Sequence, residues 1–470
     1  MSAAYRERWN PAVQREIDSR IERYRQADFA GRLPGLAPGR EVKIEQMSHD
    51  FIFGAHIFNF DQLGSTERNR RYRDLFGPLF NSATIAFYWK TLETEPGKPR
   101  FAGTERDTAA YWNSLEKPWE EPHWRRPATD PVVEFCLERG IRLHGHPFIW
   151  GSRQWHHPPW IEAEVAPPEE RAALGNFAPE FLQNLAPGEI AARAPVLTAE
   201  LHRLFSRRIS EIVARYGDRI HSWDVVNESA TDFARGNMVS GEAICKSHYG
   251  IMPGDYAYAA FQEAGRLLPE HVALNINDYL NTPDYARQVI DLQQRGARID
   301  IVGSQMHLFD PRLVLQLAEG QDIEAPVNTP QQIWEKMASH ARPGLPLHLS
   351  EITITSGEND TRGQQIQAII TRNLYRTWFA VKEMMGITWW NLVDDCGAPG
   401  EPSFSGVFSR NMEPKPAFHV LQHLINEEWK TRKTLQADRE GTIAFRGFRG
   451  RYRASWVDES GQRQEHIFTV

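Results

Sequence analysis

The stretch His221-Ser-Trp-Asp-Val-Val-Asn227-Glu228 carries an apolar run directly into a polar Asn-Glu pair. Leu347-His-Leu-Ser-Glu351 repeats this arrangement later in the chain. Short apolar runs that end in polar residues are typical of buried strands in a parallel sheet. Both stretches therefore predict a glutamate at the carboxyl end of a strand.

Similar runs recur through most of the 470 residues and alternate with helical patterns. This alternation predicts an α/β protein with a parallel sheet. Eight strand–helix units indicate a (β/α)8 barrel, a TIM barrel, in which ligands bind at the loops after the strands. The predicted strands span residues 51–56, 84–89, 142–149, 221–227, 272–277, 299–306, 345–350 and 386–391. The predicted helices include residues 201–216, 255–268, 282–295 and 364–384.

The segments outside the barrel predict a small β module. Residues 14–25 have a helical pattern and residues 41–46 a strand pattern, and short strand patterns at 442–445, 452–456 and 466–470 are separated by turn signals. Three short strands bury little apolar surface alone, so we expect the N-terminal strand to pair with them around Phe445, Tyr452 and Trp456. The expected domains are an N-terminal helix and strand (1–47), the catalytic barrel (48–430) and the β module (431–470).

Composition narrows the class of protein. With 54 Lys and Arg against 61 Asp and Glu, the net charge is −7, which argues against a nucleic-acid partner. No apolar run has the length of a membrane span, and the first residues lack the pattern of a signal peptide. We therefore expect no membrane association and a cytoplasmic location for the sequence as written, or a secreted or periplasmic one if a signal peptide has been removed. The 15 Trp residues are a weak indication of a carbohydrate ligand.

Two glutamates at one barrel mouth have a specific chemical use. Cleavage of a glycosidic bond needs one protonated carboxyl to donate to the leaving oxygen and one ionised carboxylate to attack the anomeric carbon. For a retaining enzyme we expect the two carboxyl groups to lie about 5–5.5 Å apart. No organic cofactor or metal enters this chemistry. A zinc site at His144 and His146 is disfavoured because no third ligand follows the known hydrolase patterns.

Polar and aromatic residues also end the other predicted strands. The third strand closes with His144-Gly-His146, the fifth with Asn277-Asp278-Tyr279, the sixth with Gln305-Met306-His307 and the eighth with Trp389-Trp390-Asn391. A structural role is a reasonable interpretation of each one alone. Because all of them fall on the same face of a barrel, we expect them to surround a ligand.

These residues resemble the family 10 glycoside hydrolases, whose characterised members are mainly endo-1,4-β-xylanases. The resemblance implies a retaining hydrolase in which Glu228 is the acid/base and Glu351 the nucleophile. It also implies that His146, Asn227, Gln305 and His307 surround the sugar at the cleavage point, and we expect Lys90, Trp150, Tyr279 and Trp390 to complete the substrate site. The matching stretches are 145–150, 223–228, 254–261, 277–279, 305–308, 350–351, Trp390 with Asp394, and 414–417.

The sequence departs from the family pattern at several places. The usual Glu-Asn-x-x-Lys-Trp string after the second strand aligns with residues 86–91, where Lys90 alone is kept. Thr353 stands where an Asp usually orients the histidine of strand six, so we expect another polar atom to hold a ring nitrogen of His307. The usual His after Trp150 is missing, and the second Trp of the last loop is replaced near 396–398. These changes predict an altered substrate preference.

Two long loops follow the second and third strands, at residues 105–131 and 151–197, and both contain several Trp and Pro residues. Long loops without secondary structure are usually functional, but we assign none of the second-strand loop to the site. The overall interpretation is a retaining endo-acting β-1,4-glycoside hydrolase that acts on xylan or xylo-oligosaccharides. The alternatives are hydrolysis of another β-glycan or of short decorated xylo-oligosaccharides, and a non-catalytic carbohydrate-binding barrel.

Overall fold

A closed barrel of eight parallel strands forms the centre of the molecule in the computed structural model, which describes residues 1–118, 126–280 and 282–470. The strands pair in chain order, and pairing of β10 with β7 closes the circle. Their side chains are almost entirely buried, as expected for a sheet covered on its outer face by helices. The barrel strands are β3 (Ile52–His56), β4 (Ser82–Ala86), β5 (Arg142–His146), β7 (Ser222–Asn227), β10 (Ala273–Asp278), β11 (Ile301–Leu308), β12 (Leu347–Ile354) and β13 (Met384–Trp389).

A helix packs outside the barrel after each strand, so the predicted (β/α)8 architecture is confirmed. The helices that complete the eight units are α3 (Thr66–Leu79), α6 (Thr129–Glu138), α10 (Pro195–Tyr216), α12 (Tyr256–Leu267), α13 (Pro283–Gln294), α15 (Pro330–His340), α16 (Thr361–Phe379) and α17 (Pro416–His423). Helix α17 continues into the π-helical turn η5 (Leu424–Glu428). Among the described residues, no helix is both long enough and apolar enough to cross a lipid bilayer.

Several element boundaries differ from the sequence prediction, and three of the differences have a clear local cause. The second strand ends at Ala86 rather than at residue 89, because the chain turns there into the short helix α4 (Trp89–Leu92). The third strand divides into β5 and β6 (Ile149–Trp150), since Pro147 between them has no backbone N–H to donate. Helix α16 ends at Phe379, and the last part of the range predicted as helix begins strand β13.

The loop after the third strand, residues 151–197, folds mainly into short helices despite its many prolines. It contains η3 (Ile161–Val165), α7 (Pro168–Ala173), η4 (Gly175–Phe177), α8 (Pro179–Leu182) and α9 (Pro187–Arg193) before α10 begins. In the four α-helices the proline occupies the first helical position, where a missing N–H costs no hydrogen bond. In the second-strand loop, η1 (Glu105–Asp107) and α5 (Ala109–Ser114) are described, whereas Trp119, Pro122 and Trp124 lie outside the described residues.

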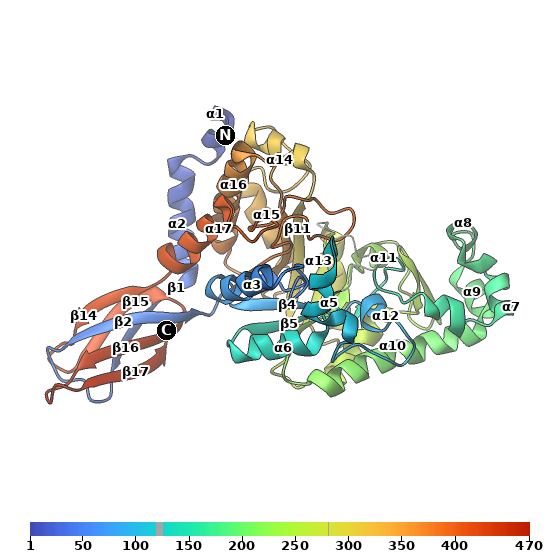
Figure 1. Ribbon diagram of the computed structural model, residues 1–470, viewed down its shortest axis with the longest axis horizontal. Helices are drawn as coiled ribbons and strands as arrows, with labels where there is room; N and C mark the ends of the chain where they lie inside the picture. Colours follow the sequence, from blue (N-terminus) through green and yellow to red (C-terminus); the bar gives the residue numbers. More distant parts are fainter. Residues whose placement is uncertain (119–125, 281) are drawn as a thin grey trace.

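Strands from both sides of the barrel sequence form the small β module, as predicted. Strand β2 (Glu41–His49) lies between β14 (Arg432–Gln436) and β16 (Gly450–Val457), and β17 (Arg463–Thr469) pairs with β16 at the edge. A two-stranded ribbon of β1 (Gln26–Arg32) and β15 (Thr442–Phe448) shares the same apolar core. Figure 1 shows this module at the far end of the molecule from α7 to α9.

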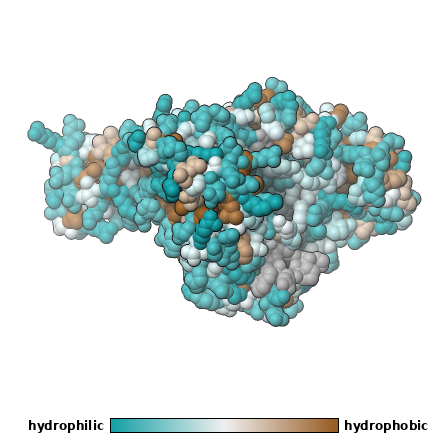
Figure 2. All heavy atoms as spheres, turned by 90° about the horizontal axis from the view of Figure 1, so that it is seen from above, coloured by the Kyte–Doolittle hydropathy of each residue, from teal (hydrophilic) through white to brown (hydrophobic). Residues whose placement is uncertain are grey.

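Phe445, Tyr452 and Trp456 are all buried in the core of the module, as predicted. The N-terminal helices α1 (Ala3–Arg8) and α2 (Pro11–Arg25) precede its first strand, and α2 packs against α16 of the barrel. Figure 2 shows mostly hydrophilic side chains on the face seen from above, with hydrophobic residues scattered in small groups. The division of the chain at 47/48 and 430/431 stays a proposal.

Candidate active site

Irregular backbone positions aim the two glutamates into the barrel mouth. Glu228 follows the last residue of β7 with φ 53°, a left-handed conformation that is rare for a residue with a side chain, and its N–H donates to the Asn277 carbonyl at 2.7 Å. Glu351 lies inside β12, directly after a shift of register against β11 at Ser304/Gln305. Bulges of this kind turn a side chain out of the regular alternation. A strained backbone at Glu228 and a register shift at Glu351 thus direct both carboxyl groups to the same place.

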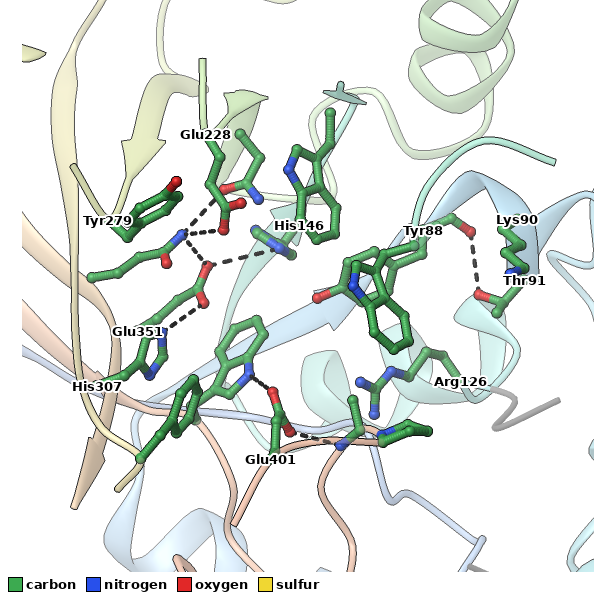
Figure 3. Close-up of a pocket in the computed structure, with 18 of the residues that line it drawn as sticks. Tyr88, Lys90, Thr91, Arg126, His146, Glu228, Tyr279, His307, Glu351 and Glu401 are labelled. Atoms are coloured by element: carbon green, nitrogen blue, oxygen red, sulfur yellow. Dashed lines mark hydrogen bonds and ion pairs between the residues drawn. The ribbon is translucent and has the colours of Figure 1, made fainter. Parts of the chain in front are cut away.

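One amide nitrogen joins the two glutamates. Nε2 of Gln305 lies 3.1 Å from Oε1 of Glu228 and 3.1 Å from Oε1 of Glu351, so these oxygens can be at most twice 3.1 Å, or 6.2 Å, apart. That upper limit is below the separation of about 6.5 Å at which a water molecule fits between the carboxyl groups of an inverting enzyme. Figure 3 shows the side chains of Glu228 and Glu351 close to each other in the cavity.

Burial raises the pKa of both carboxyl groups. The pKa of Glu228 rises to about 7, first because the group is desolvated and second because Glu351 is close. Desolvation also raises the pKa of Glu351 to about 7, and His146 and Asn277 oppose this rise. Asn277 Nδ2 donates to Glu351 at 2.7 Å in addition to the shared bond. These donors stabilise the ionised form, so the first proton of the pair leaves Glu351 and the remaining proton stays on Glu228.

Two histidines contact the same buried carboxylate, that of Asp224. Nε2 of His144 and Nδ1 of His146 each lie 2.8 Å from Oδ2 of Asp224. Burial opposes ionisation of Asp224, but the two histidines lower its pKa below the ordinary value. The other ring nitrogen of His146 lies 3.8 Å from Glu351. Asp224 therefore fixes the orientation of His146, and both histidines form hydrogen bonds with this one carboxylate. No group of side chains suited to holding a metal ion occurs in residues 1–118, 126–280 and 282–470.

The prediction that His307 finds a substitute partner is confirmed. Oγ1 of Thr353, the residue that stands in place of the usual Asp, lies 2.9 Å from Nδ1 of His307. Nε2 of the same ring lies 3.4 Å from Oε2 of Glu351. Burial lowers the pKa of His307 to about 4, so the imidazole is neutral near pH 7. A neutral hydroxyl thus fixes the ring without adding a negative charge beside Glu351.

All ten residues assigned to the site from the sequence line one cavity of about 1300 Å³. Lys90 Nζ donates to the Gln154 carbonyl at 2.9 Å, and Asn227 Oδ1 accepts from Asn277 at 2.8 Å. The Trp390 indole donates to Glu401 at 3.1 Å. The assigned residues in the lining are Lys90, His146, Trp150, Asn227, Glu228, Tyr279, Gln305, His307, Glu351 and Trp390.

The cavity is also lined by residues that the sequence analysis did not assign to the site. Glu105, Arg106 and Arg126 of the second-strand loop line it, together with Thr104 just before that loop. The Arg126 guanidinium lies 4.6 Å from the centre of the Phe58 ring. No periodic pattern in the sequence indicates that residues of this loop reach the cavity.

Tyr88 and Glu401 are two further additions, both visible in Figure 3. Glu401 accepts from the Trp390 indole, from Asn391 Nδ2 at 3.0 Å and from the Ala398 N–H at 2.6 Å, and it thereby fixes Trp390. Tyr88 belongs to the departing 86–91 stretch, in which Trp89 is buried and donates to Glu93 at 2.7 Å. Of the third-strand tryptophans, Trp155 lines the cavity and Trp160 is buried away from it.

A comparison with protein-family models matches residues 106–424 to glycosyl hydrolase family 10. The match covers more than half of the chain and begins after β4, so the departing stretch 86–91 lies outside it. Two curated relatives are each 24% identical: endo-1,4-beta-xylanase C of Paenibacillus barcinonensis over 74% of this chain, and anti-sigma-I factor RsgI6 of Acetivibrio thermocellus over 69%. The matched regions span only 29% and 34% of those proteins.

Among solved structures, xylanase 10B from Thermotoga petrophila RKU-1 in complex with xylobiose is similar with a TM-score of 0.54. The alignment covers 81% of this chain and 95% of that chain at 17% sequence identity. At 17% sequence identity, this similarity is evidence for the fold alone.

Proposed function

Because the chain belongs to glycosyl hydrolase family 10, we propose that it is a retaining, endo-acting β-1,4-glycoside hydrolase that cleaves xylan or xylo-oligosaccharides. The family resemblance predicted from the sequence is thereby confirmed. The observation that supports the retaining reaction most directly is the shared Gln305 donor, which limits the separation of the Glu228 and Glu351 oxygens to 6.2 Å, twice 3.1 Å. Direct attack by a carboxylate needs a pair this close.

In the first step, an ionised Glu351 attacks the anomeric carbon while Glu228 gives its proton to the leaving glycosidic oxygen. The carbon–oxygen bond to the leaving sugar breaks, and an ester bond to Glu351 forms. In the free protein Asn277 contacts Oε1 of Glu351 and His307 contacts Oε2. Whichever oxygen attacks, a neighbouring residue therefore stays in place at the other oxygen, which becomes the ester carbonyl. In the second step, water attacks the same carbon and gives a proton to Glu228, while the ester bond to Glu351 breaks and releases the Glu351 carboxylate. Both glutamates are then restored.

The surroundings of Glu228 explain how it can act as an acid in the first step and as a base in the second. Desolvation and the nearby Glu351 raise its pKa to about 7 in the free protein, so it carries a proton when substrate arrives. Formation of the ester removes the negative charge of Glu351. The pKa of Glu228 then falls, and the group becomes a base at the moment the second step requires one.

A different β-linked glycan, or a short decorated xylo-oligosaccharide, is the second candidate substrate. Two observations favour this second candidate. The residues that usually hold the next sugar in this family are absent from 86–91. Tyr88, Arg126 and Glu401 line the cavity instead. Aromatic and charged side chains in these positions present a different set of hydrogen-bond donors and acceptors to the sugar hydroxyls. The chemistry of cleavage is the same for both candidates.

A non-catalytic carbohydrate-binding barrel is the remaining alternative, and one relative carries the name of an anti-sigma factor. The retained pair of glutamates argues against it. Two carboxyl groups that share one donor in a desolvated site repel each other when both are ionised, a cost that binding alone would not require.

The test is digestion of a panel of β-glycans, including linear xylan, decorated xylan, xylo-oligosaccharides, cellulose and mixed-linkage glucan, with product analysis by chromatography. Proton NMR of the first-formed product should show the β-anomer, which is the mark of retention. Internal cleavage of xylan into several oligosaccharide lengths supports the endo-acting proposal. Absence of cleavage of every glycan, with tight binding to one of them, would favour the non-catalytic barrel.

A further inference from the structure

A two-stranded hairpin brings a tyrosine to the candidate acid/base. Strands β8 (Ile244–Ser247) and β9 (Gly250–Pro253) pair antiparallel, and Ser247 faces Gly250, so His248 and Tyr249 form the tip. The Tyr249 hydroxyl lies 3.3 Å from Oε2 of Glu228 and 3.2 Å from the hydroxyl of Tyr279. Both contacts are long for hydroxyl hydrogen bonds, as is common in unliganded active sites, where they shorten when substrate binds.

The hairpin tip is fastened to the helix that follows Glu228. Asp232 of α11 (Ala230–Ala234) is fully buried and accepts from the backbone N–H of His248 and from the Tyr256 hydroxyl at 2.8 Å. The N–H of Tyr249 donates to Ser247 Oγ at 3.2 Å. The tyrosine and the glutamate are therefore both positioned by the same short segment, 228–232, which gives their contact a fixed geometry.

Gln305 decides which oxygen of Glu228 can carry a proton. Its Nε2 contacts Oε1 of Glu228, Oε1 of Glu351 and Oδ1 of Asn227, three acceptors, so the amide group is oriented as a donor. An oxygen that accepts from an amide is the poorer site for a hydroxyl proton. In neutral Glu228 the proton therefore belongs on Oε2, the oxygen that faces Tyr249.

A phenol has one proton and can donate to one partner at a time. When Glu228 is neutral, Oε2–H donates to Tyr249 and Tyr249 donates to Tyr279. When Glu228 is ionised, the chain reverses, and Tyr279 donates to Tyr249, which donates to Oε2. Every hydroxyl has a partner in both states. The other titratable groups that act on Glu228 are Glu351 of β12, Asp278 of β10 and Tyr88 after β4, and none of them contacts Oε2 in the structure as described.

We propose that Tyr249 is a positioning residue for Glu228, whose hydroxyl accepts from the neutral carboxyl and donates to the carboxylate, so that one contact serves both halves of the reaction. This inference rests on the proposed function. In the first step the Oε2 proton moves to the leaving oxygen as the sugar–oxygen bond breaks, and Tyr249 turns to donate to the new carboxylate. In the second step the water proton returns to Oε2, and the tyrosine turns back.

The test is Tyr249→Phe, which removes one oxygen and keeps the ring that packs 6.2 Å from Trp150. We expect kcat/KM on xylo-oligosaccharides to fall by roughly tenfold and the alkaline limb of its pH profile to move up by roughly 0.5–1 unit, because the carboxylate loses a donor. On an aryl glycoside whose leaving group needs no proton, kcat/KM should stay within about twofold of the wild type.

The control is Tyr258→Phe, because the Tyr258 hydroxyl donates to the Arg295 carbonyl at 2.9 Å on the outer side of the barrel. This variant should keep the wild-type pH profile. An unshifted alkaline limb in Tyr249→Phe, or an equal loss on both classes of substrate, would overturn the proposal.

A titration that needs no enzymatic activity tests the role of Tyr249 independently of the proposed function. In protein with ¹³C-labelled glutamate, NMR titration should give a higher pKa for Glu228 in Tyr249→Phe than in the wild type. If the wild type cleaves no glycan, the proposed function is wrong, and the titration still decides whether Tyr249 acts on Glu228. An equal Glu228 pKa in the two proteins would refute the contact.

Discussion

The hydroxyl of Thr353 lies 2.9 Å from Nδ1 of His307, at the position where the family usually has an aspartate that orients this ring. A hydroxyl can donate to Nδ1, which leaves the single proton of the neutral imidazole on Nε2, facing Glu351, and it brings no charge. Because Nε2 of His307 lies 3.4 Å from Oε2 of Glu351, an aspartate at position 353 would add a second negative charge near Glu351, the proposed nucleophile. The substitution keeps the orientation of the histidine and removes that repulsion.

Thr353→Val should reduce kcat/KM by roughly tenfold, since loss of a partner that orients a functional histidine commonly costs this much or more. The shape of the side chain is kept, so the melting temperature should change little. The control is Thr371→Val in α16, where Oγ1 makes no hydrogen bond within the described part of the chain. Equal activity of wild type and Thr353→Val would show that the threonine does not orient His307.

Glu351→Ala should lower kcat by roughly four orders of magnitude, because it removes the group that forms the ester. Added azide should enter the vacated space, attack the anomeric carbon and give the α-glycosyl azide, with inversion, from an activated aryl β-glycoside. NMR of the product reports the anomer. Near-normal activity of this variant without azide would show that the nucleophile lies elsewhere.

Glu228→Ala tests the proposed acid/base in the same way as Glu351→Ala tests the proposed nucleophile. With an activated aryl glycoside the ester should still form, but its hydrolysis should be slow because the base is missing. Azide should then release the β-glycosyl azide, with net retention. Opposite product anomers from the two variants would distinguish acid/base from nucleophile, whereas the same anomer from both would contradict the assignment.

The strand ends could be predicted from sequence because each barrel strand is a short apolar run followed by polar residues. Glu228, Glu351, Gln305 and His307 all fall at such ends, so their convergence follows from the barrel itself. The end of β4 was misplaced because Phe87 and Trp89 continue the apolar run while packing into a turn and a helix.

Arg126, Glu401 and Tyr249 could not be predicted, since loops and a hairpin bring them to the cavity from distant parts of the chain. Their positions depend on single contacts, such as that of His248 with Asp232, and not on any periodic pattern. Nothing in the sequence around Tyr249 indicates that the tip of the hairpin reaches Glu228.

Glu351→Gln should make the protein more resistant to heat at high pH. The pKa of Glu351 is about 7 in the folded protein against 4.5 ordinarily, so between these values the folded chain binds more protons than the unfolded chain. The free energy of unfolding of the wild type therefore falls as the pH rises through this window. Glutamine carries no charge, and we expect its melting temperature to exceed that of the wild type by roughly 2–5 °C at pH 8.

The same comparison at pH 5 should show a much smaller difference, because pH 5 lies near the lower end of this window and Glu351 is still protonated in the folded wild type. Glu67→Gln is the control, since Glu67 is exposed and pairs with Arg70. Differential scanning calorimetry at both pH values makes the measurement. A difference that is as large at pH 5 as at pH 8 would contradict the raised pKa.

Trp456→Ala should lower the free energy of unfolding by about 3–5 kcal/mol, the usual cost of emptying a buried tryptophan site. Only 4% of the Trp456 surface is exposed, and its neighbours in the β module cannot fill the space. KM on soluble oligosaccharides and binding to insoluble xylan should not change. Val457→Ala, one residue later and 54% exposed, is the control; lost xylan binding in Trp456→Ala would instead identify a sugar-binding module.

The position of β2 between β14 and β16 also constrains how the protein can be synthesised. Gln46 of β2 pairs with Tyr452 of β16, so the strand leaves the ribosome about 400 residues before its partner. At roughly 5–20 residues per second, β2 waits on the order of 20 to 80 s with both edges unpaired. During that time it can be captured by a chaperone or by another nascent chain, and the yield of folded protein should depend on translation speed more than the stability of the finished barrel suggests.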